Sequence, residues 1–359
     1  MEQNISNATT TQLNSGVSNF SVASQVLDTG SGKEIYYDFP DARQQLGYYK
    51  KIPELKKAVD NLIIWTIGKG YETNSYNRVI LEHLTGWGED SFQSISKNLL
   101  IQKKIFGDGF AEIIRDKDTG TLINLKPLFT GDMRVVCNNK GFIIRYEQRT
   151  QKGEVEKFKP NEILHICNDR IGNEIHGVSI IDACKWIIDA RNEAMNDWRR
   201  ISHRSTIRVL YVDIEDPTKL NTLREQYKEG IKNGEVLILP GKKGDIEFED
   251  LTLPPLEAYL GWIQYLENVF YQAVGIPRVI ASSQEYSEAS SKVGYLTFEP
   301  IYTNEQTEYE LDLWNKLGIK VKFNRPPSLS STMQDSETKN TGQTGFQANE
   351  VEASVVKNE

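Results

Sequence analysis

The sequence predicts an α+β fold in which long helices separate two groups of short strands. Apolar residues recur at helical spacing over two long stretches, 180–205 and 254–317. Short strand-like runs bounded by turn residues gather between 106 and 167, and a smaller group occupies 206–254. Because the second group lies between the two helical stretches, it is an insertion at the end of a helical hairpin.

Length and composition limit the possible classes of protein. With 359 residues the chain is long enough for about two domains and a sizeable core. The formal net charge of -8 argues against a surface that coats nucleic acid, since such binding depends on lysine and arginine. An acidic protein can still form a passage through which DNA moves without being bound tightly. No apolar run approaches the roughly 20 residues that span a bilayer, and no signal sequence is visible, so we expect no membrane contact.

The first strand group is preceded by two helical patterns. Pro53 suits the first position of a helix that we predict from Glu54 to Ile67. A second pattern runs from Asp90 to Ile105. The apolar face of the first helix comprises Leu55, Val59, Leu62 and Ile63.

The strands between these helices and residue 167 are joined by short connections. Such connections cannot contain crossover helices, so the sheet is predicted to be antiparallel. The predicted strands cover residues 110–114, 124–129, 133–137, 142–148 and 163–167.

The longest unbroken helical pattern runs from Ile180 to about Ser205, a rod of roughly 40 Å at 1.5 Å per residue. Its predicted apolar face comprises Ile181, Cys184, Ile188, Met195 and Trp198. The insertion that follows is predicted to contain a strand, a helix and a second strand, at residues 207–212, 217–231 and 235–239.

The stretch from Pro254 to Leu317 is predicted to be two helices joined by a polar loop. Gly275 and Pro277 end the first helix, because glycine tolerates a left-handed turn and proline disfavours helical geometry in the residue before it. Pro300 predicts a kink near Glu299 in the second helix. The buried stripe of the first helix is predicted to comprise Tyr259, Ile263, Leu266, Phe270 and Ala273.

Both ends of the chain are polar. Residues 1–30 are dominated by Asn, Ser, Thr and Gln, and residues 327–359 have a similar composition with added Glu. Segments with so few large apolar side chains cannot bury enough surface to fold, so we predict a disordered arm and a disordered tail. Between the last helix and the tail, residues 319–323 are predicted to form one more strand.

No pattern predicts catalysis, a cofactor or a metal. The three cysteines, Cys137, Cys167 and Cys184, are odd in number and loosely spaced, which favours reduced core thiols in a cytoplasmic setting. His165 and His176 with two of these cysteines match no zinc spacing, so core packing is favoured. Gly107-Asp-Gly109 precedes a strand, the wrong order for a dinucleotide fingerprint. Gly241-Lys-Lys-Gly244 lacks the spacing of a phosphate loop.

Five short motifs occur in an order and at a spacing that resemble the portal proteins of tailed bacteriophages, from about Tyr48 to Phe323. Two departures are that Ile180 stands where family members often have proline, and that a polar tail replaces the helical crown, which we expect to be reduced or absent. The motifs are Phe106-Gly-Asp-Gly-Phe-Ala-Glu-Ile113, Leu125-Lys-Pro-Leu128, Asn161-Glu-Ile-Leu-His-Ile166, His176-Gly-Val-Ser-Ile180 and Gly275-Ile-Pro277.

The resemblance implies a division of the chain into named parts. The wing would be an α+β unit of residues 31–177, and the clip a small α/β insertion. The parts after the wing would be the first stem helix at 178–205, the clip at 206–254, the second stem helix at 255–278, the tunnel loop at 279–291, and a kinked helix and strand at 292–326 that return to the wing.

The resemblance also implies a function. Portal proteins form the ring at the unique capsid vertex through which double-stranded DNA is packaged and ejected, so we expect a ring of twelve identical copies in the virion, assembled in the host cytoplasm. The implied partners are the major capsid protein, the packaging terminase and then the head-tail adaptor. Two alternatives remain: another structural protein of the head-tail connector, or a DNA-acting enzyme with an unrecognised site.

The charges fit a conduit for DNA. Nine acids stand against three bases from 254 to 318, a net of -6 (Glu257, Glu267, Glu285, Glu288, Glu299, Glu305, Glu308, Glu310 and Asp312 against Arg278, Lys292 and Lys316). A channel with many acids and few bases would bind DNA weakly and let it slide.

In a lone monomer the polar loop would be a solvated linker, whereas in a ring it would form the constriction that touches DNA phosphates. The residues expected to face DNA there are Ser282, Ser283, Gln284, Glu285, Tyr286, Ser287, Glu288, Ser290, Ser291 and Lys292.

Two basic sets have both a structural and a functional interpretation. Arg199, Arg200 and Arg204, together with His203 and Arg208, either stabilise the end of the first stem helix through its dipole, which we favour slightly, or bind phosphate or an acidic neighbour. The set in the clip is a solvated face on its own, because acids interleave it, and a docking surface by the resemblance. It comprises Lys219, Arg224, Lys228, Lys232, Lys242 and Lys243.

Overall fold

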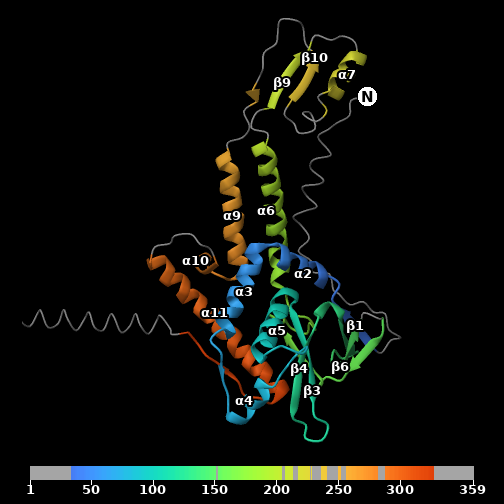
Figure 1. The fold of residues 1–359 in the computed structure, drawn as a ribbon, viewed down its shortest axis with the longest axis vertical. Coiled ribbons are helices and arrows are strands. Elements are labelled where there is room, and N and C mark those ends of the chain that lie inside the picture. Colours follow the sequence, from blue (N-terminus) through green and yellow to red (C-terminus); the bar gives the residue numbers. More distant parts are fainter. Residues whose placement is uncertain are drawn as a thin grey trace, which may run out of the picture.

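The computed structural model describes residues 34–150, 153–203, 207–212, 217–226, 228, 236–240, 250–251, 256–281 and 288–326. Figure 1 shows an elongated molecule with the wing at one end, two long helices side by side in the middle, and a small α/β unit at the other end. This arrangement confirms the predicted α+β fold with a helical hairpin. The predicted N-terminal arm and C-terminal tail lie outside the described residues.

The wing contains two larger antiparallel sheets, besides the short pair of β2 (Tyr71–Glu72) and β12 (Lys322–Phe323), where the sequence predicted one sheet. Strands β1 and β7 were not predicted, because β1 is half-buried throughout and three of the four β7 residues are exposed charged or small side chains. The first sheet has the order β1 (Glu34–Asp38), β5 (Met133–Asn138), β6 (Ile143–Arg149), β7 (Val155–Phe158). The second has the order β4 (Leu122–Leu128), β3 (Asp108–Arg115), β8 (Ile163–Cys167), and the 3-10 turn η1 (Thr130–Asp132) connects the sheets.

Four helices belong to the wing, and one of them, α5, packs against β3, β4 and β8. The predicted face of α3, with Leu55, Val59, Leu62 and Ile63, is buried as expected. Helix α5 begins with a capping box between Ser91 and Ser94 and is buried over most of its length. The sequence missed α2 and α4, since only a few residues of each are buried. The four helices are α2 (Ala42–Lys51), α3 (Pro53–Ile67), α4 (Ser75–Glu82) and α5 (Phe92–Phe106).

The middle of the molecule consists of α6 (Ile180–His203) and α9 (Leu256–Val274), which pack against each other (Figure 1). The 24 residues of α6 give a length of about 36 Å at 1.5 Å per residue. Within the described residues, no helix has both the length and the apolar composition needed to cross a membrane.

The predicted buried stripes of both helices are correct at most positions and wrong at three. On α6, Met195 is exposed and Trp198 is half-buried, because this part of α6 has left the wing. On α9, Ala273 is exposed, and Val274 is buried in its place because the last turn of α9 enters the wing core. The side chain of Tyr259 is not among those described. The correctly predicted residues are Ile181, Cys184, Ile188, Leu266 and Phe270, with Ile263 half-buried.

After α9 the chain turns at Gly275, whose φ of 73° is left-handed, as the predicted stop requires. Two helices then follow, α10 (Arg278–Ala281) and α11 (Glu288–Leu317). The predicted loop at 279–291 is therefore too long at both ends. Helix α11 begins at Glu288, within the predicted loop.

Helix α11 continues through Pro300 without ending. The Thr303 hydroxyl donates to the carbonyls of Glu299, at 2.8 Å, and Pro300, at 3.1 Å, in the turn that follows the proline. Of the predicted final strand, only β12 (Lys322–Phe323) forms, and it pairs with β2 (Tyr71–Glu72) of the wing.

The far end of the molecule is a small α/β unit. Strands β9 (Ile207–Val212) and β10 (Val236–Pro240) are parallel, with α7 (Pro217–Gln226) between them in sequence, and β11 (Asp250–Leu251) pairs with β9 in the antiparallel sense. A parallel pair needs such a crossover connection. The described elements agree with the predicted insertion; of the predicted helix at 217–231, residues 227 and 229–231 lie outside the described residues.

Candidate functional site

Two of the sequence motifs meet at the junction of the wing with α6. The carbonyl of Gly107 accepts from the backbone N–H of Asn168 at 2.7 Å, and the Asn168 carbonyl accepts from Val178 N–H at 2.8 Å. A Cβ atom on Gly107 would collide with the Gly177 carbonyl, and one on Gly177 would collide with the Gly107 carbonyl. Both glycines are therefore required by the close approach of the two backbones.

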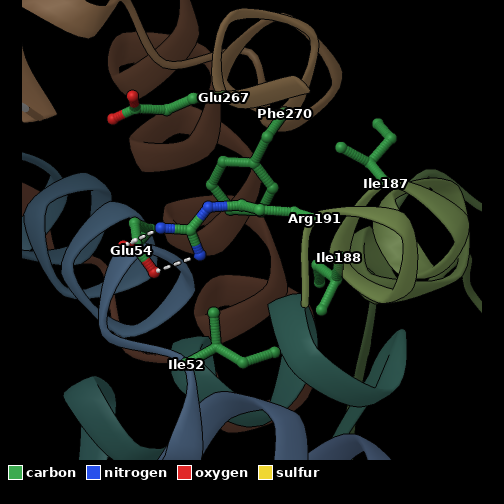
Figure 2. Close-up of a pocket in the computed structure, with 7 residues that line it drawn as sticks. All are labelled: Ile52, Glu54, Ile187, Ile188, Arg191, Glu267 and Phe270. Carbon is green, nitrogen blue, oxygen red and sulfur yellow. Dashed lines mark hydrogen bonds and ion pairs between the residues drawn. The ribbon is translucent and has the colours of Figure 1, made fainter. Parts of the chain in front are cut away.

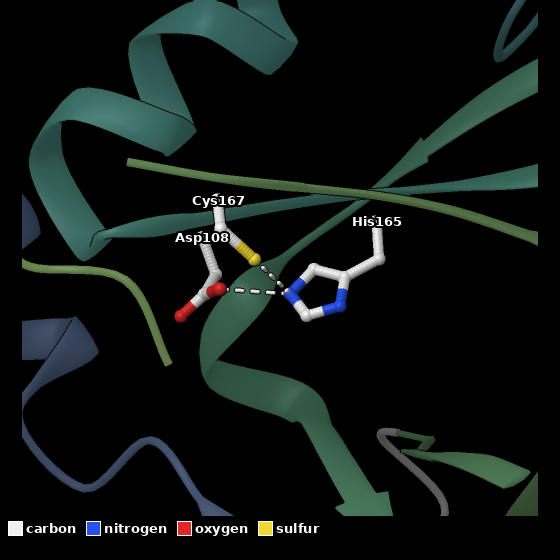
Figure 3. Close-up of side chains that lie close together, drawn as sticks. All are labelled: Asp108, His165 and Cys167. Atoms are coloured by element: carbon white, nitrogen blue, oxygen red, sulfur yellow. Dashed lines mark hydrogen bonds and ion pairs between the residues drawn. The ribbon is translucent and has the colours of Figure 1, made fainter. Parts of the chain in front are cut away.

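A buried carboxylate lies beside this contact (Figure 3). Asp108 Oδ1 is 2.7 Å from His165 Nε2, and its Oδ2 accepts from the backbone N–H of Gly177 at 3.2 Å. The His165 Nδ1 atom is 3.2 Å from the Tyr146 hydroxyl, and the Cys167 sulfur is 3.2 Å from Nε2. These contacts connect β3, β6 and β8 to the segment that leads into α6.

Burial and hydrogen bonding act in opposite directions on Asp108. Burial alone would raise the pKa of this carboxyl, but the His165 ring, and the His176 ring 3.3 Å from Oδ2, outweigh burial and hold the pKa far below its usual range. Burial raises the pKa of the Cys167 thiol well above its ordinary value, and the Asp108 charge adds to the effect. Asp108 is therefore a carboxylate, and Cys167 a thiol.

Asp108, His165 and Cys167 are residue types that bind zinc, and one atom of each lies within 4.8 Å of the other two. Their contacts of 2.7 and 3.2 Å are those of hydrogen bonds. Ligands at 2.0–2.3 Å from a tetrahedral ion would be separated by roughly 3.3–3.8 Å. The three side chains therefore form a hydrogen-bonded cluster, which agrees with the predicted packing of His165 and Cys167 in the core. Cys184 is not part of it.

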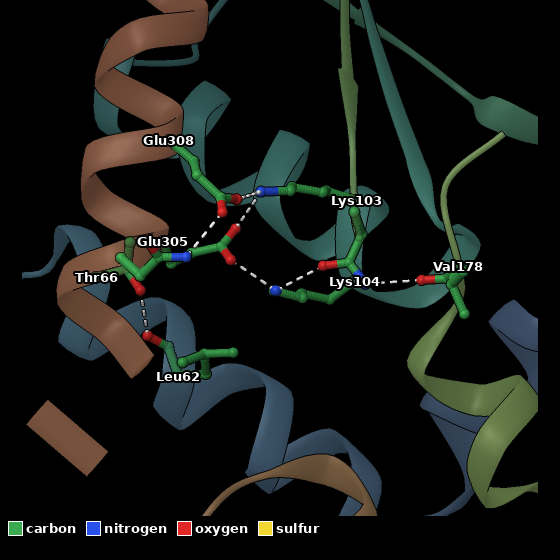
Figure 4. Close-up of polar contacts among 9 residues, drawn as sticks. Leu62, Thr66, Lys103, Lys104, Val178, Glu305 and Glu308 are labelled. Carbon is green, nitrogen blue, oxygen red and sulfur yellow. Dashed lines mark hydrogen bonds and ion pairs between the residues drawn. The ribbon is translucent and has the colours of Figure 1, made fainter. Parts of the chain in front are cut away.

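A second buried polar network connects α5 with α11 (Figure 4). Lys103 Nζ is 2.7 Å from Glu305 and 3.1 Å from Glu308, and its side chain is 1% exposed. Lys104 Nζ is 2.6 Å from the other Glu305 oxygen and donates to Asn168 Oδ1 at 2.7 Å. Asn168 Nδ2 in turn donates to the Val178 carbonyl at 2.7 Å. One chain of polar contacts therefore joins α11, α5 and the segment before α6.

The charges of this network support one another. Burial alone would lower the pKa of Lys103 and raise that of Glu305, but the attraction between them outweighs burial, so the pKa of Lys103 is raised and that of Glu305 is lowered. Asp312 lies one turn beyond Glu308 on α11. Its burial raises its pKa to about 6, and the neighbouring Glu308 and Glu305 contribute.

Two ion pairs lie where α6 and α9 meet the wing, and Figure 2 shows the one between Arg191 and Glu54. Arg191 on α6 donates to both oxygens of Glu54 on α3, at 2.6 and 3.2 Å, and Arg278 on α10 donates to Glu267 on α9 at 3.0 Å. The cavity between them has a volume of about 10 Å³, room for about one water molecule. Its lining comprises Ile52, Glu54, Ile187, Ile188, Arg191, Glu267 and Phe270.

The residues predicted to face DNA fall into two groups, those outside the described residues and those in α11. Residues 282–287 lie outside the described residues, which leaves Ser282, Ser283, Gln284, Glu285, Tyr286 and Ser287 without a structural test. Glu288, Ser290, Ser291 and Lys292 lie in the first turns of α11, so their prediction as loop residues was wrong. Serine-rich composition indicated a loop there, but helical geometry extends four residues before Lys292.

Several of the acids assigned to a DNA conduit have other partners. Glu305 is buried, and both Glu305 and Glu308 bind Lys103. Glu267 binds Arg278, and Glu310 accepts from the Phe323 backbone N–H at 2.7 Å. The net charge of the stretch therefore overstates the charge available to DNA.

The basic sets are only partly described. Arg199 is exposed near the end of α6, Arg200 lies in α6, and Arg204 lies outside the described residues. In the clip, Lys219 is exposed on α7 and Arg224 lies on the same helix. Lys228 is 3.1 Å from Glu225, in line with a solvated face. Lys232, Lys242 and Lys243 lie outside the described residues.

Sequence reasoning missed Asp108, Lys103, Lys104 and Glu305 as members of buried networks. The one available signal was the position of Asp108 between two glycines, directly after a predicted helix and before a predicted strand.

Comparison with solved structures identifies the architecture. A gene transfer agent virion protein has a TM-score of 0.59 and 16% identity, over 88% of this chain and 92% of that one. A protein from the neck of the native gene transfer agent particle, computed with C12 symmetry, has a TM-score of 0.59 and 17% identity, over 89% and 93%. The HK97 family phage portal protein from Corynebacterium diphtheriae has a TM-score of 0.54 and 12% identity, over 77% and 94%.

These likenesses show that the fold is shared with proteins of gene transfer agent particles and with an HK97 family phage portal protein. The family model for phage portal proteins matches residues 87–351, about three quarters of the chain, so the protein belongs to the phage portal protein family. No curated protein sequence matches. The predicted family and its portal-like fold are thereby confirmed. The family is one of structural proteins of phage particles.

Proposed function

We propose that this portal protein forms a closed ring around a channel for double-stranded DNA at the unique capsid vertex. The observation that carries the proposal is the pair α6 and α9, which places two separate folded units at opposite ends of one rod (Figure 1). Copies arranged side by side along these rods would enclose a channel. A closed ring requires two different, complementary faces on each copy, and the rod offers one on each helix.

The ring would contain twelve copies. Support comes from the neck protein of the gene transfer agent particle, which is similar in fold and was computed with C12 symmetry. The ring would assemble in the host cytoplasm and then become part of the virion.

The parts of the chain would have the roles that the portal family implies. The wing would face the major capsid protein, and the clip would bind the terminase during packaging and the head-tail adaptor afterwards. Lys219, on the exposed side of α7, and Lys228 would belong to that docking surface. The protein itself would carry no catalytic site, so a separate ATPase would drive packaging.

The tunnel loop would be the narrowest part of the channel. Ser282 to Ser287 would contact the DNA backbone there, with Glu288, Ser290, Ser291 and Lys292 at the start of α11 close behind. Small hydroxyl groups can touch phosphates without fixing a sequence register. Arg199, Arg200 and Arg204 at the other end of α6 would supply a local attraction for phosphate or for an acidic neighbour.

Electron microscopy of the purified protein tests the proposal. We expect closed rings with a central channel, and persistent monomers at micromolar concentration would contradict it. The tunnel loop is tested separately by the double variant Glu285→Lys/Glu288→Lys, with Glu154→Lys/Glu156→Lys on the exposed edge of the wing as the matched control. The loop variant is expected to retain DNA longer, whereas equal retention in both variants would argue against a loop that faces DNA.

A further inference from the structure

One side of α9 exposes a pair of aromatic rings. Trp262 is 48% exposed and Tyr265 is 55% exposed, and their rings stack with centroids 5.6 Å apart and an angle of 21° between planes. Such side chains gain most from losing contact with water, and a stacked pair presents a flat apolar surface. Gly261 adjoins this pair and is also exposed. We name these three residues the α9 face.

The position of Gly261 is not explained by the fold of a single copy. A glycine inside a helix costs roughly 1 kcal/mol relative to alanine. A Cβ added at Gly261 would meet no atom within 4 Å, so nothing in the same chain requires the glycine. The distance between packed helices depends on the side chains at the contact, and a glycine permits the closest approach. The close approach of a helix from another molecule would explain why glycine occupies this position.

The composition of the α9 face favours protein over DNA as its occupant. Its exposed neighbours Gln264 and Gln272 are uncharged, so no charge there opposes contact with another protein surface. Aromatic residues are enriched, and charged residues depleted, at the centre of protein interfaces.

The outer side of α6 offers a different surface. Trp186 is 58% exposed, and the exposed charged residues next to it are Lys185, Asp189 and Glu193, one base and two acids with a net charge of -1. Two copies of this surface would bring their acids together, whereas the uncharged α9 face would not repel it. The charges therefore favour a head-to-tail contact, the kind that closes rings, over contact of like with like.

We propose that the α9 face of one copy packs against the Trp186 side of α6 in the next copy, with Gly261 at the point of closest approach. The inference rests on the proposed ring and names the surfaces that close it. In a ring the contact would recur at every subunit boundary and form a continuous belt of helices around the channel.

The first experiment separates the glycine's effect on assembly from its effect on folding. Gly261→Ala and Gly261→Leu favour the helix, so the melting temperature of the dissociated chain should stay the same or rise. The fraction of chains in rings, measured by native mass spectrometry, should fall by about tenfold or more for Gly261→Leu. The matched control is Gly47→Ala, at a helical glycine of α2 where an added Cβ also meets no atom within 4 Å, and it should assemble as the unmodified chain does.

The second experiment locates the contact. The variant Trp186→Cys/Tyr265→Cys is treated with a short bismaleimide and should give a ladder of cross-linked oligomers, whereas each single variant should not. The unmodified chain is the background control and reports any reaction of the native cysteines, of which Cys137 and Cys184 are buried and Cys167 is partly buried. Rings that form but give no ladder would overturn the inference and leave the proposed function intact.

Two other outcomes are informative. If the unmodified chain forms no rings, the proposed function itself fails. If Tyr265→Ala leaves assembly unchanged but alters DNA retention, the α9 face contacts DNA, and the inference is wrong.

Discussion

Lys104 Nζ on α5 lies 2.6 Å from the Glu305 carboxylate on α11. The same ammonium group donates to Asn168, which binds the segment that begins α6. Helix α11 and the segment that leads into α6 are thus attached to the same side chain. A displacement of α11 would disturb Lys104 and, through it, the base of the stem.

Replacing Lys104 with methionine tests how much this attachment contributes to stability. Lys104→Met leaves Glu305 with one buried partner and Asn168 with none at that oxygen, and breaking a buried ion pair costs about 3–5 kcal/mol. Chemical denaturation should show a loss of that order. The control Lys97→Met, on the exposed side of the same helix, should change the free energy of unfolding by about 0.5 kcal/mol or less. Equal effects would mean that the network contributes little.

The close approach of Gly107 and Gly177 predicts a large effect of a single methyl group. Gly177→Ala places a Cβ against the backbone of Gly107 and Asn168, so the wing and α6 must separate. We expect a lower melting temperature for Gly177→Ala and little change for Gly47→Ala, where the added methyl meets nothing within 4 Å. An unchanged melting temperature in Gly177→Ala would show that the junction is looser than described.

The buried carboxylate of Asp108 predicts a particular response to acid. Because its pKa in the folded protein lies below the unfolded value, its contribution to stability is present above about pH 4 and is lost as pH falls towards the folded pKa. Asp108→Asn should therefore be less stable than the unmodified protein at pH 7, and the difference should narrow below about pH 4. Asp118→Asn, in an exposed turn, is the control and should show no such difference.

Asp312 predicts a pH dependence of stability opposite in sign to that of Asp108. Its pKa of about 6 in the folded protein lies above the unfolded value, so folding favours the protonated form, and stability falls as pH rises from about 4 through 6. The charged groups that face it are Lys103, Glu308, Glu305 and Lys316. Asp312→Asn should raise the melting temperature at pH 8 and leave it almost unchanged at pH 4.5. An equal shift of the melting temperature at pH 4.5 and at pH 8 would exclude titration of Asp312 as the cause.

The parts of the fold that the sequence could predict are those determined by local periodicity. Helices α3, α5, α6 and α9 and the central strands follow from apolar spacing within about 25 residues. Ala273 and Met195 were wrongly placed in buried stripes, because which side of a long helix is covered depends on where the wing ends. The start of α11 was missed because small polar residues favour a loop locally, whereas its packing against α3 and α10 is tertiary.

The polar networks could not be predicted in the same way. Lys103 and Lys104 follow each other on a helix and have the composition of an exposed face, yet both are buried. Their partner Glu305 is about 200 residues further along the chain. The two glycine motifs at 107 and 177 were recognised individually, but their contact and the role of Asp108 depend on the strand register that brings Asp108 opposite Cys167.

The pairing of β12 with β2 has a consequence for the order of folding. Phe323, in β12, stacks on Tyr309 and contacts Tyr71 of β2, so residues from the last described part of the chain complete a core begun near its start. A ribosome releases Tyr71 long before it has made Phe323. Contacts between such distant residues form slowly, and the unfinished core stays open until they do. The core of the wing can therefore be completed only after the residues between β2 and β12 have been translated. Subunits with a complete core exist only when synthesis is almost finished.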